Sequence, residues 1–115
     1  MGIIYKNSIE YGNTQSSGSL GIQETLLFEG DLSTGSAALT ESILNFNYLL
    51  FVVYLNSYSS TINPILRVKD YVLGENIRLG NHTQYLIIKF NVGTSVYSTN
   101  ASSATLKKIY GIKFL

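Results

Sequence analysis

The segment Asn47–Asn56 sets the first limit on the fold, because eight of its ten residues are apolar or aromatic. Valine, tyrosine and phenylalanine favour an extended strand, and a strand with one solvated face alternates between apolar and polar side chains. Here one face carries Tyr48, Leu50, Val52 and Tyr54, and the other carries Leu49, Phe51, Val53 and Leu55. Monomers rarely expose a large apolar patch. We therefore expect the outer face to be covered, either by residues 31–46 or by a neighbouring subunit.

The rest of the chain consists of short strand-like segments separated by turns rich in Gly, Ser and Asn. The expected strands are Ile3–Lys6, Ile22–Gly30, Ser36–Thr40, Ile65–Gly74, Gln84–Gly93, Thr94–Thr99 as a hairpin return, and Ala104–Leu115. We expect Ile22–Thr40 to form a hairpin and residues 41–46 to form one helical turn or a bend. Strands at intervals of about ten residues, without a long helical period, predict an antiparallel β-sandwich or jelly roll. The prediction is all-β, with about seven to eight strands in a single domain spanning residues 1–115.

Composition and charge exclude several classes of protein. The chain has 115 residues, no cysteine and a net charge of +1. Disulfides and thiolate metal sites are therefore excluded, and nucleic-acid binding is not expected without a basic face. No apolar run approaches the ~20 residues that a membrane-spanning helix needs, so we expect no membrane insertion.

Catalysis and metal binding have little support in the sequence. His82 is the only histidine and lies in a polar turn, whereas nucleophilic triads and zinc sites need a histidine among several partners. Glu29 and Asp31 flank Gly30 at a turn. Such a pair is weak support for a glycosidase, which needs two facing carboxylates, or for a calcium site, which needs six to eight oxygens. We expect no enzyme, no metal and no cofactor.

The nine tyrosines are the best candidates for ligand contact. A tyrosine ring packs on the apolar face of a sugar while its hydroxyl bonds to water or ligand. Tyr58 and Tyr97 lie in or beside polar loops, and Asn81 and His82 form a polar turn. These four residues are the predicted ligand-binding set. In the alternative interpretation, the tyrosines pack on the sandwich or at a subunit interface, where they are enriched.

The apolar outer face of Asn47–Asn56 favours a homo-oligomer. Its predicted interface residues are Tyr48, Leu50, Val52 and Tyr54. The final segment, which ends in IYGIKFL, raises the same expectation because it keeps apolar side chains on both faces.

Two stretches of the chain resemble small β-sandwich domains at the C-terminal ends of bacteriophage tail-fibre and baseplate proteins. They are LLFEGDLSTGSAALTESILNFNYLLFVVYLN and LKKIYGIKFL. The match spans roughly Leu26–Leu55 and Thr105–Leu115, which is under half of the chain. The positions that carry the resemblance are Gly35, Ser36, Leu39, Glu41, Ser42, Ile43, Asn45, Phe46 and Tyr48, followed by Ile109, Tyr110, Gly111, Ile112 and Lys113.

The resemblance implies a virion component, commonly trimeric, that acts at the host cell surface. Such a module binds bacterial surface polysaccharide, or it is a purely structural subunit that contacts only other virion proteins. No site residues follow from the shared motifs. We expect any receptor specificity to lie in Ser57–Ser103, because loops on a rigid scaffold commonly carry binding function.

Overall fold

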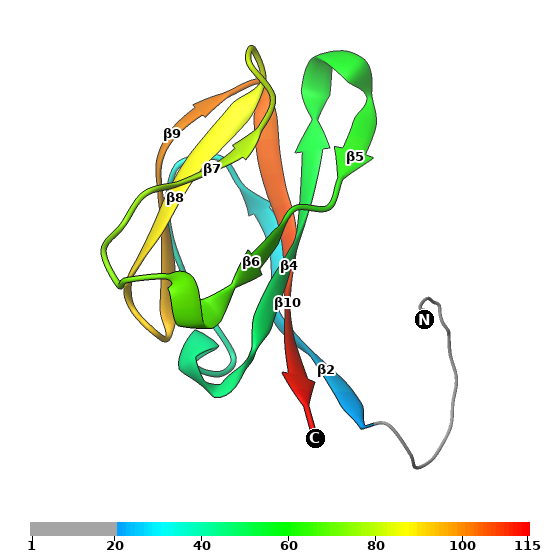
Figure 1. Ribbon diagram of the computed structural model, residues 1–115. Coiled ribbons are helices and arrows are strands. Elements are labelled where there is room, and N and C mark those ends of the chain that lie inside the picture. Colours follow the sequence, from blue (N-terminus) through cyan, green and yellow to red (C-terminus); the bar gives the residue numbers. More distant parts are fainter. Residues whose placement is uncertain (1–20) are drawn as a thin grey trace.

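Residues 21–115, which the computed structural model describes, form two antiparallel sheets packed face to face (Figure 1). The expected strand Ile3–Lys6 lies outside the described residues. The strands are β2 (Ile22–Leu32), β3 (Gly35–Ala38), β4 (Tyr48–Leu55), β5 (Ser60–Ile62), β6 (Ile65–Arg67), β7 (Ile77–Gly80), β8 (Tyr85–Val92), β9 (Ser95–Ser102) and β10 (Ala104–Phe114). Three short 3₁₀ helices join them: η1 (Ile43–Asn45), η2 (Asn56–Tyr58) and η3 (Val68–Asp70).

The first sheet has the strand order β2-β10-β4-β5, with β6 also paired to β4, and the second has the order β3-β9-β8-β7. This arrangement confirms the all-β sandwich. The described residues contain more strands than expected because Asn63 and Pro64 divide one partner of β4 into β5 and β6. Proline has no backbone N–H to donate to the ladder, although the Pro64 carbonyl still accepts a hydrogen bond from the Phe51 N–H.

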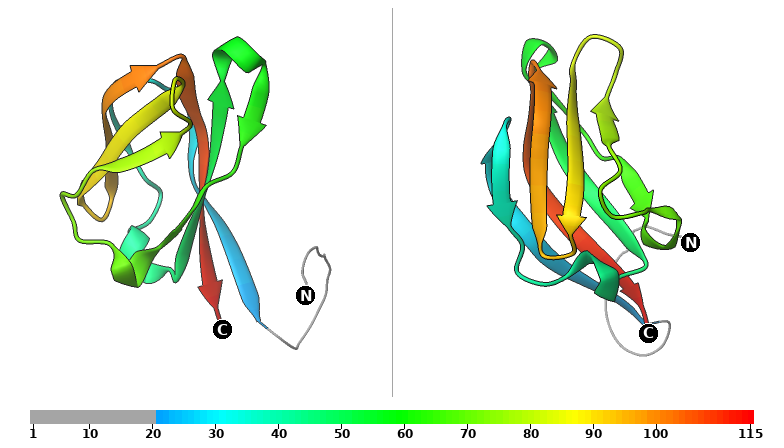
Figure 2. Two further views of the ribbon diagram at one scale, coloured as in Figure 1. Left: turned by 45° about the horizontal axis from the view of Figure 1, so that its top comes forward. Right: turned by 90° about the vertical axis from the view of Figure 1, so that its left-hand side faces the viewer.

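Alternate side chains of the strands fill the core between the two layers. Phe51 of β4 and Phe90 of β8 meet across it with ring centroids 6.5 Å apart. In Figure 2 (right), β8 and β9 lie in front of β10 and β2, so the core is the space that separates these layers. The largest fully buried side chains come from both sheets: Leu27, Leu49, Phe51, Val53, Leu86, Ile88, Phe90, Val96, Leu106 and Ile109, together with Ile43 of η1.

The predicted hairpin of Ile22–Thr40 is wrong, because β2 and β3 belong to different sheets. β2 pairs with β10, and β3 pairs with β9. The chain changes sheet at residues 33–34, and Gly35 follows with a φ of +98° that favours glycine. A local turn suggested the hairpin, but β2 pairs with the long strand β10 and forms an edge of the first sheet, while β3 pairs with β9 in the second sheet.

Two further expectations have different outcomes. The helical turn in residues 41–46 is confirmed as η1, which Ser42 caps by accepting a hydrogen bond from the Leu44 N–H. The expected strand Ile65–Gly74 stops at Arg67, because Val68 turns inward, is buried and donates its N–H to the Asn47 carbonyl.

β4 has one fully buried face and one half-buried face. Leu49, Phe51, Val53 and Leu55 are buried, whereas Tyr48, Leu50, Val52 and Tyr54 are partly exposed. Residues 31–46 do not cover this outer face, since they supply β3 to the opposite sheet and η1 to one end of the core. Within the described chain, the outer face of β4 therefore keeps the apolar surface that the sequence predicts.

Candidate functional site

Three of the four predicted ligand residues gather at one end of the sandwich. Tyr58 belongs to η2, and Asn81 and His82 form the turn between β7 and β8; both loops lie at the upper end in Figure 1. The two loops are joined directly, because the Ser57 N–H donates to the Gln84 side-chain oxygen at 3.0 Å. Gln84 is buried, so this bond is fixed from inside the sandwich. We call this set of loops, residues 56–59 and 81–83, the loop rim.

The β7–β8 turn holds its own shape with side chains. The Arg78 guanidinium donates to the carbonyls of Asn81 and His82 at 3.3 and 3.2 Å. The Asn81 side-chain oxygen accepts from the N–H groups of Thr83 and Gln84 at 3.0 and 2.8 Å. This is the Asx-turn chemistry for which asparagine is favoured in turns. Asn81 therefore builds the turn that presents the exposed side chain of His82.

Tyr58 presents the largest aromatic surface on the loop rim. Its side chain is 59% exposed. Aromatic rings in such positions are amphipathic contact surfaces, with an apolar face and a polar hydroxyl. Every residue of the loop rim is exposed, and Tyr58 and His82 are the two that carry a ring for contact with a ligand.

Tyr97 does not belong to the loop rim. It lies on β9, opposite Lys89 of β8 and Ser36 of β3, on the outer face of the second sheet. Ser102, at the rim end of β9, is five positions further along the strand, roughly 16 Å at about 3.3 Å per residue. The Lys89 ammonium lies 5.8 Å from the centre of the Tyr97 ring. The structure thus separates Tyr97 from the other predicted ligand residues.

The predicted interface residues extend into a wider apolar surface. Register places Leu26, Tyr110, Leu50 and Ile65 beside one another on β2, β10, β4 and β6. Residues paired in this way share a face of the sheet. We call these four residues the apolar row. It has Tyr48 and Val52 on either side along β4, and Ile65 is 64% exposed. The row therefore crosses four strands, of which the sequence indicated the part on β4 and the apolar final segment that contains Tyr110, but not Leu26 or Ile65.

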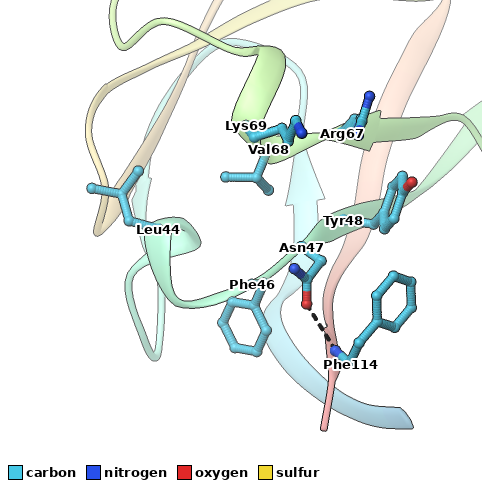
Figure 3. A pocket seen from close by; sticks show the side chains of 8 residues that line it. All are labelled: Leu44, Phe46, Asn47, Tyr48, Arg67, Val68, Lys69 and Phe114. Atoms are coloured by element: carbon cyan, nitrogen blue, oxygen red, sulfur yellow. Dashed lines mark hydrogen bonds between the residues drawn. The ribbon is translucent and has the colours of Figure 1, made fainter.

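A pocket of about 480 Å³ lies at the opposite end of β4 from the loop rim (Figure 3). Ligand sites for small molecules commonly enclose ~300–1,000 Å³. Tyr48 at the pocket and Leu55 beside η2 are seven positions apart on β4, a distance of roughly 23 Å at about 3.3 Å per residue. The residues that line it come from η1, β4, β6, η3 and β10: Leu44, Phe46, Asn47, Tyr48, Arg67, Val68, Lys69 and Phe114.

The pocket has an aromatic wall and a basic edge. The rings of Tyr48 and Phe114 are 5.6 Å apart and form one wall. In Figure 3, Arg67 and Lys69 stand along the upper edge, above Tyr48. Asn47 lies between them and Phe114, and its side-chain oxygen accepts from the Phe114 N–H at 2.8 Å. Sequence reasoning missed this pocket because its walls come from distant parts of the chain.

The carboxylates considered for catalysis or calcium are paired with lysines. Asp31 forms an ion pair with Lys107, and Glu29 lies 3.8 Å from the Lys108 ammonium. In residues 21–115, no group of three or more His, Cys, Asp or Glu side chains is placed to hold a metal ion. The helices in the same range are all too short or too polar to cross a membrane.

Comparison with known proteins gives no assignment. No protein family matches the chain, and no curated protein matches it either. The function must therefore be argued from the geometry of the loop rim, the apolar row and the pocket.

Proposed function

We propose that the chain is a non-enzymatic module of a bacteriophage virion, of tail-fibre or baseplate type, that binds a cell-surface glycan through the loop rim. It would act at the host cell surface as part of the extracellular particle. The resemblance in Gly35–Tyr48 and Ile109–Lys113 supports the virion context. The ion pairs of Glu29 and Asp31 support the non-enzymatic part of the proposal.

The observation that carries the proposal is the exposed Tyr58 ring on a braced loop. The Ser57–Gln84 hydrogen bond fixes η2 to the sheet end, and the β7–β8 turn beside it is held by Arg78. A site held before the ligand arrives loses less entropy on binding. The loop rim also lies at the end of the sandwich opposite the C-terminal end of β10 (Figure 1).

A glycan array followed by titration tests this proposal. We expect the wild-type protein to bind at least one bacterial surface polysaccharide. Tyr58→Ala should weaken that binding roughly tenfold, because the sugar loses its aromatic stacking surface. Tyr97→Ala is the matched control, since it removes the same ring from the outer face of the second sheet. Both variants should keep the wild-type melting temperature within about 2 °C, as exposed substitutions cost little stability.

Two outcomes would contradict the loop rim as the site. Equal binding by the wild type and Tyr58→Ala would show that the Tyr58 ring does not contact the glycan. A loss with Tyr97→Ala alone would move the site to the outer face of β8 and β9. Absence of binding to every polysaccharide on the array would overturn the glycan proposal as a whole.

The apolar row favours a second candidate, a purely structural virion subunit that contacts only other proteins. Leu26, Tyr110, Leu50 and Ile65 form a continuous apolar strip across four strands, which is typical of protein interfaces. We propose a homo-oligomer through this face, with a trimer favoured by the resemblance. The structural candidate predicts that loop-rim variants leave assembly and particle attachment unchanged.

A further inference from the structure

The pocket between β4, β6 and β10 is a second potential binding site, separate from the loop rim. Its lining carries two positive charges, Arg67 and Lys69, and none of the eight lining residues is acidic. Asp70 lies 3.6 Å from the Arg67 guanidinium but does not line the pocket. A guanidinium has five N–H donors in a fixed fork. One exposed carboxylate therefore leaves Arg67 with donors for a ligand.

The lower part of the pocket is suited to the apolar face of a ring. Tyr48 and Phe114 form a tilted aromatic pair, with an angle of 54° between their planes. Val68 and Phe46 lie on the other sides of the same space (Figure 3). Stacking on such a wall would orient a flat or cyclic ligand, and the basic residues would then face its polar edge.

Asn47 supplies the remaining polar group and is held in place. Its side-chain oxygen accepts the Phe114 N–H, its backbone N–H donates to the Ile112 carbonyl, and its carbonyl accepts from Val68. With the oxygen engaged, the side-chain amide offers its NH₂ donors toward the space that Phe114 and Phe46 border. The polar groups available to a ligand are therefore mainly donors, which match an acceptor-rich anion.

We infer that this pocket binds an acidic saccharide residue, a sugar ring that bears a carboxylate or phosphate group. The ring stacks against Tyr48 and Phe114, and the anionic group reaches Arg67 and Lys69 at the pocket edge. The site is independent of the loop rim, since β4 separates the two. A neutral sugar would leave the Lys69 ammonium and the remaining Arg67 donors bound only to water, so charge is the property that selects the ligand.

Titration of the ¹⁵N-labelled protein with three galactose derivatives tests the inference. The probes are galacturonate, its methyl ester and galactose 6-phosphate. We expect either anion to shift the amide signals of Asn47 and Phe114 and to bind roughly fivefold or more tightly than the neutral ester, because two exposed cations each contribute a modest attraction. Raising NaCl from about 50 to about 500 mM should reduce this preference by screening.

Variants separate the pocket from general charge effects. Arg67→Gln with Lys69→Gln should abolish the preference for the anions. Lys89→Gln with Lys107→Gln removes the same net charge away from the pocket and should preserve it. Tyr58→Ala should also preserve the preference for the anions, because Tyr58 lies at the loop rim. The loop-rim proposal and the pocket inference can therefore fail independently of each other.

Three results would overturn the inference. One is equal binding of galacturonate and its methyl ester, and another is the absence of shifts at Asn47 and Phe114 with every probe. The third is retention of the preference in the Arg67→Gln/Lys69→Gln variant while its amide spectrum shows the wild-type fold.

Discussion

The contact between two single residues explains why the resembling stretches carry a glycine at position 111 and a phenylalanine at position 46. Gly111 lies in the middle of β10, where glycine is normally unfavourable. In this position the ring of Phe46 packs directly on the backbone, and an added Cβ would come within 2.6–2.7 Å of three ring atoms. These include the Cγ atom, which is fixed close to the Phe46 backbone. The glycine in IYGIK is therefore required by the packing of residue 46, and both belong to the resembling stretches.

Replacing Gly111 tests this contact. Gly111→Ala should lower the free energy of unfolding by ~1–3 kcal/mol, because the extra methyl group overpacks a buried site. Urea denaturation measures the change. Gly30→Ala is the control, because its Cβ would meet only the far end of the Phe28 ring, at 3.2 Å. Adding Phe46→Leu to Gly111→Ala should recover part of the loss. Equal stability of Gly111→Ala and the wild type would show that Phe46 moves aside without cost.

At the scale of elements, the segment between β6 and β7 depends on one tyrosine for its attachment to the second sheet. The Tyr71 hydroxyl accepts the Phe90 N–H at 2.9 Å and donates to the Glu75 carbonyl at 2.6 Å. Its ring meets the Phe90 ring edge-on at 5.9 Å. The Gly74 N–H also donates to the Phe90 carbonyl. The connection runs from the first sheet to the second. The two hydrogen bonds to the Phe90 backbone attach it to β8 at this one residue.

Removing the Tyr71 hydroxyl should loosen that connection. Tyr71→Phe leaves the Phe90 N–H without its partner, which should cost ~1–3 kcal/mol of unfolding free energy where the group stays buried. Hydrogen exchange should show faster exchange of the Phe90 and Gly74 amides, and urea denaturation should give the cost. Tyr97→Phe is the control, because that hydroxyl lies on the exposed outer face. Unchanged exchange at Phe90 in Tyr71→Phe would contradict the role of the hydroxyl.

The same elements show which parts of the fold can be predicted from sequence. Strong alternation in Gln84–Gly93 and the apolar ends of Ala104–Leu115 predicted β8 and β10 closely, because burial on one face fixes a period of two. Pairing of β2 with β10 joins residues about 80 positions apart, so local turn signals predicted the wrong partner for β3. The composition of Ile65–Gly74 is regular for a strand throughout, so it did not predict that β6 ends at Arg67 and that η3 follows.

Sequence reasoning predicted the candidate sites unequally for the same physical reason. The sequence placed Tyr58, Asn81 and His82 in polar loops because such loops follow directly from turn composition, and neighbouring strand ends bring these loops together; their role as a ligand site stays a prediction. The pocket joins Asn47, Arg67 and Phe114, which meet only after three strands have paired. Arg67 and Lys69 alternate with Leu66 and Val68 in the sequence, and this alternation is typical of the solvated face of a strand. No local pattern distinguishes such a face from the edge of a pocket.

At the scale of the whole molecule, the two outer faces of the sandwich differ in chemistry. The second sheet presents Arg78 stacked on Tyr85 at 3.8 Å and Lys89 near Tyr97, so its exposed aromatic rings are paired with cations. The first sheet also has such a pair, since the Lys108 ammonium lies 6.0 Å from the centre of the Tyr110 ring, but its apolar row ends in the exposed aliphatic side chains of Leu26 and Ile65. The aliphatic side chains at both ends of the apolar row are therefore the feature on which the proposed assembly through the first sheet depends.

The last prediction concerns that assembly. Light scattering coupled to size exclusion should give a stable oligomer for the wild type, with a trimer favoured, at every concentration measured. Leu50→Lys with Val52→Lys should give a folded monomer, because two charges would then be buried without partners at the interface. Ile87→Lys with Thr99→Lys places the same charges on the outer face of the second sheet and should leave the mass unchanged. A wild-type monomer, or a variant of Leu50 and Val52 that keeps the wild-type mass, would contradict the interface. The apolar row would then be available to a different protein partner.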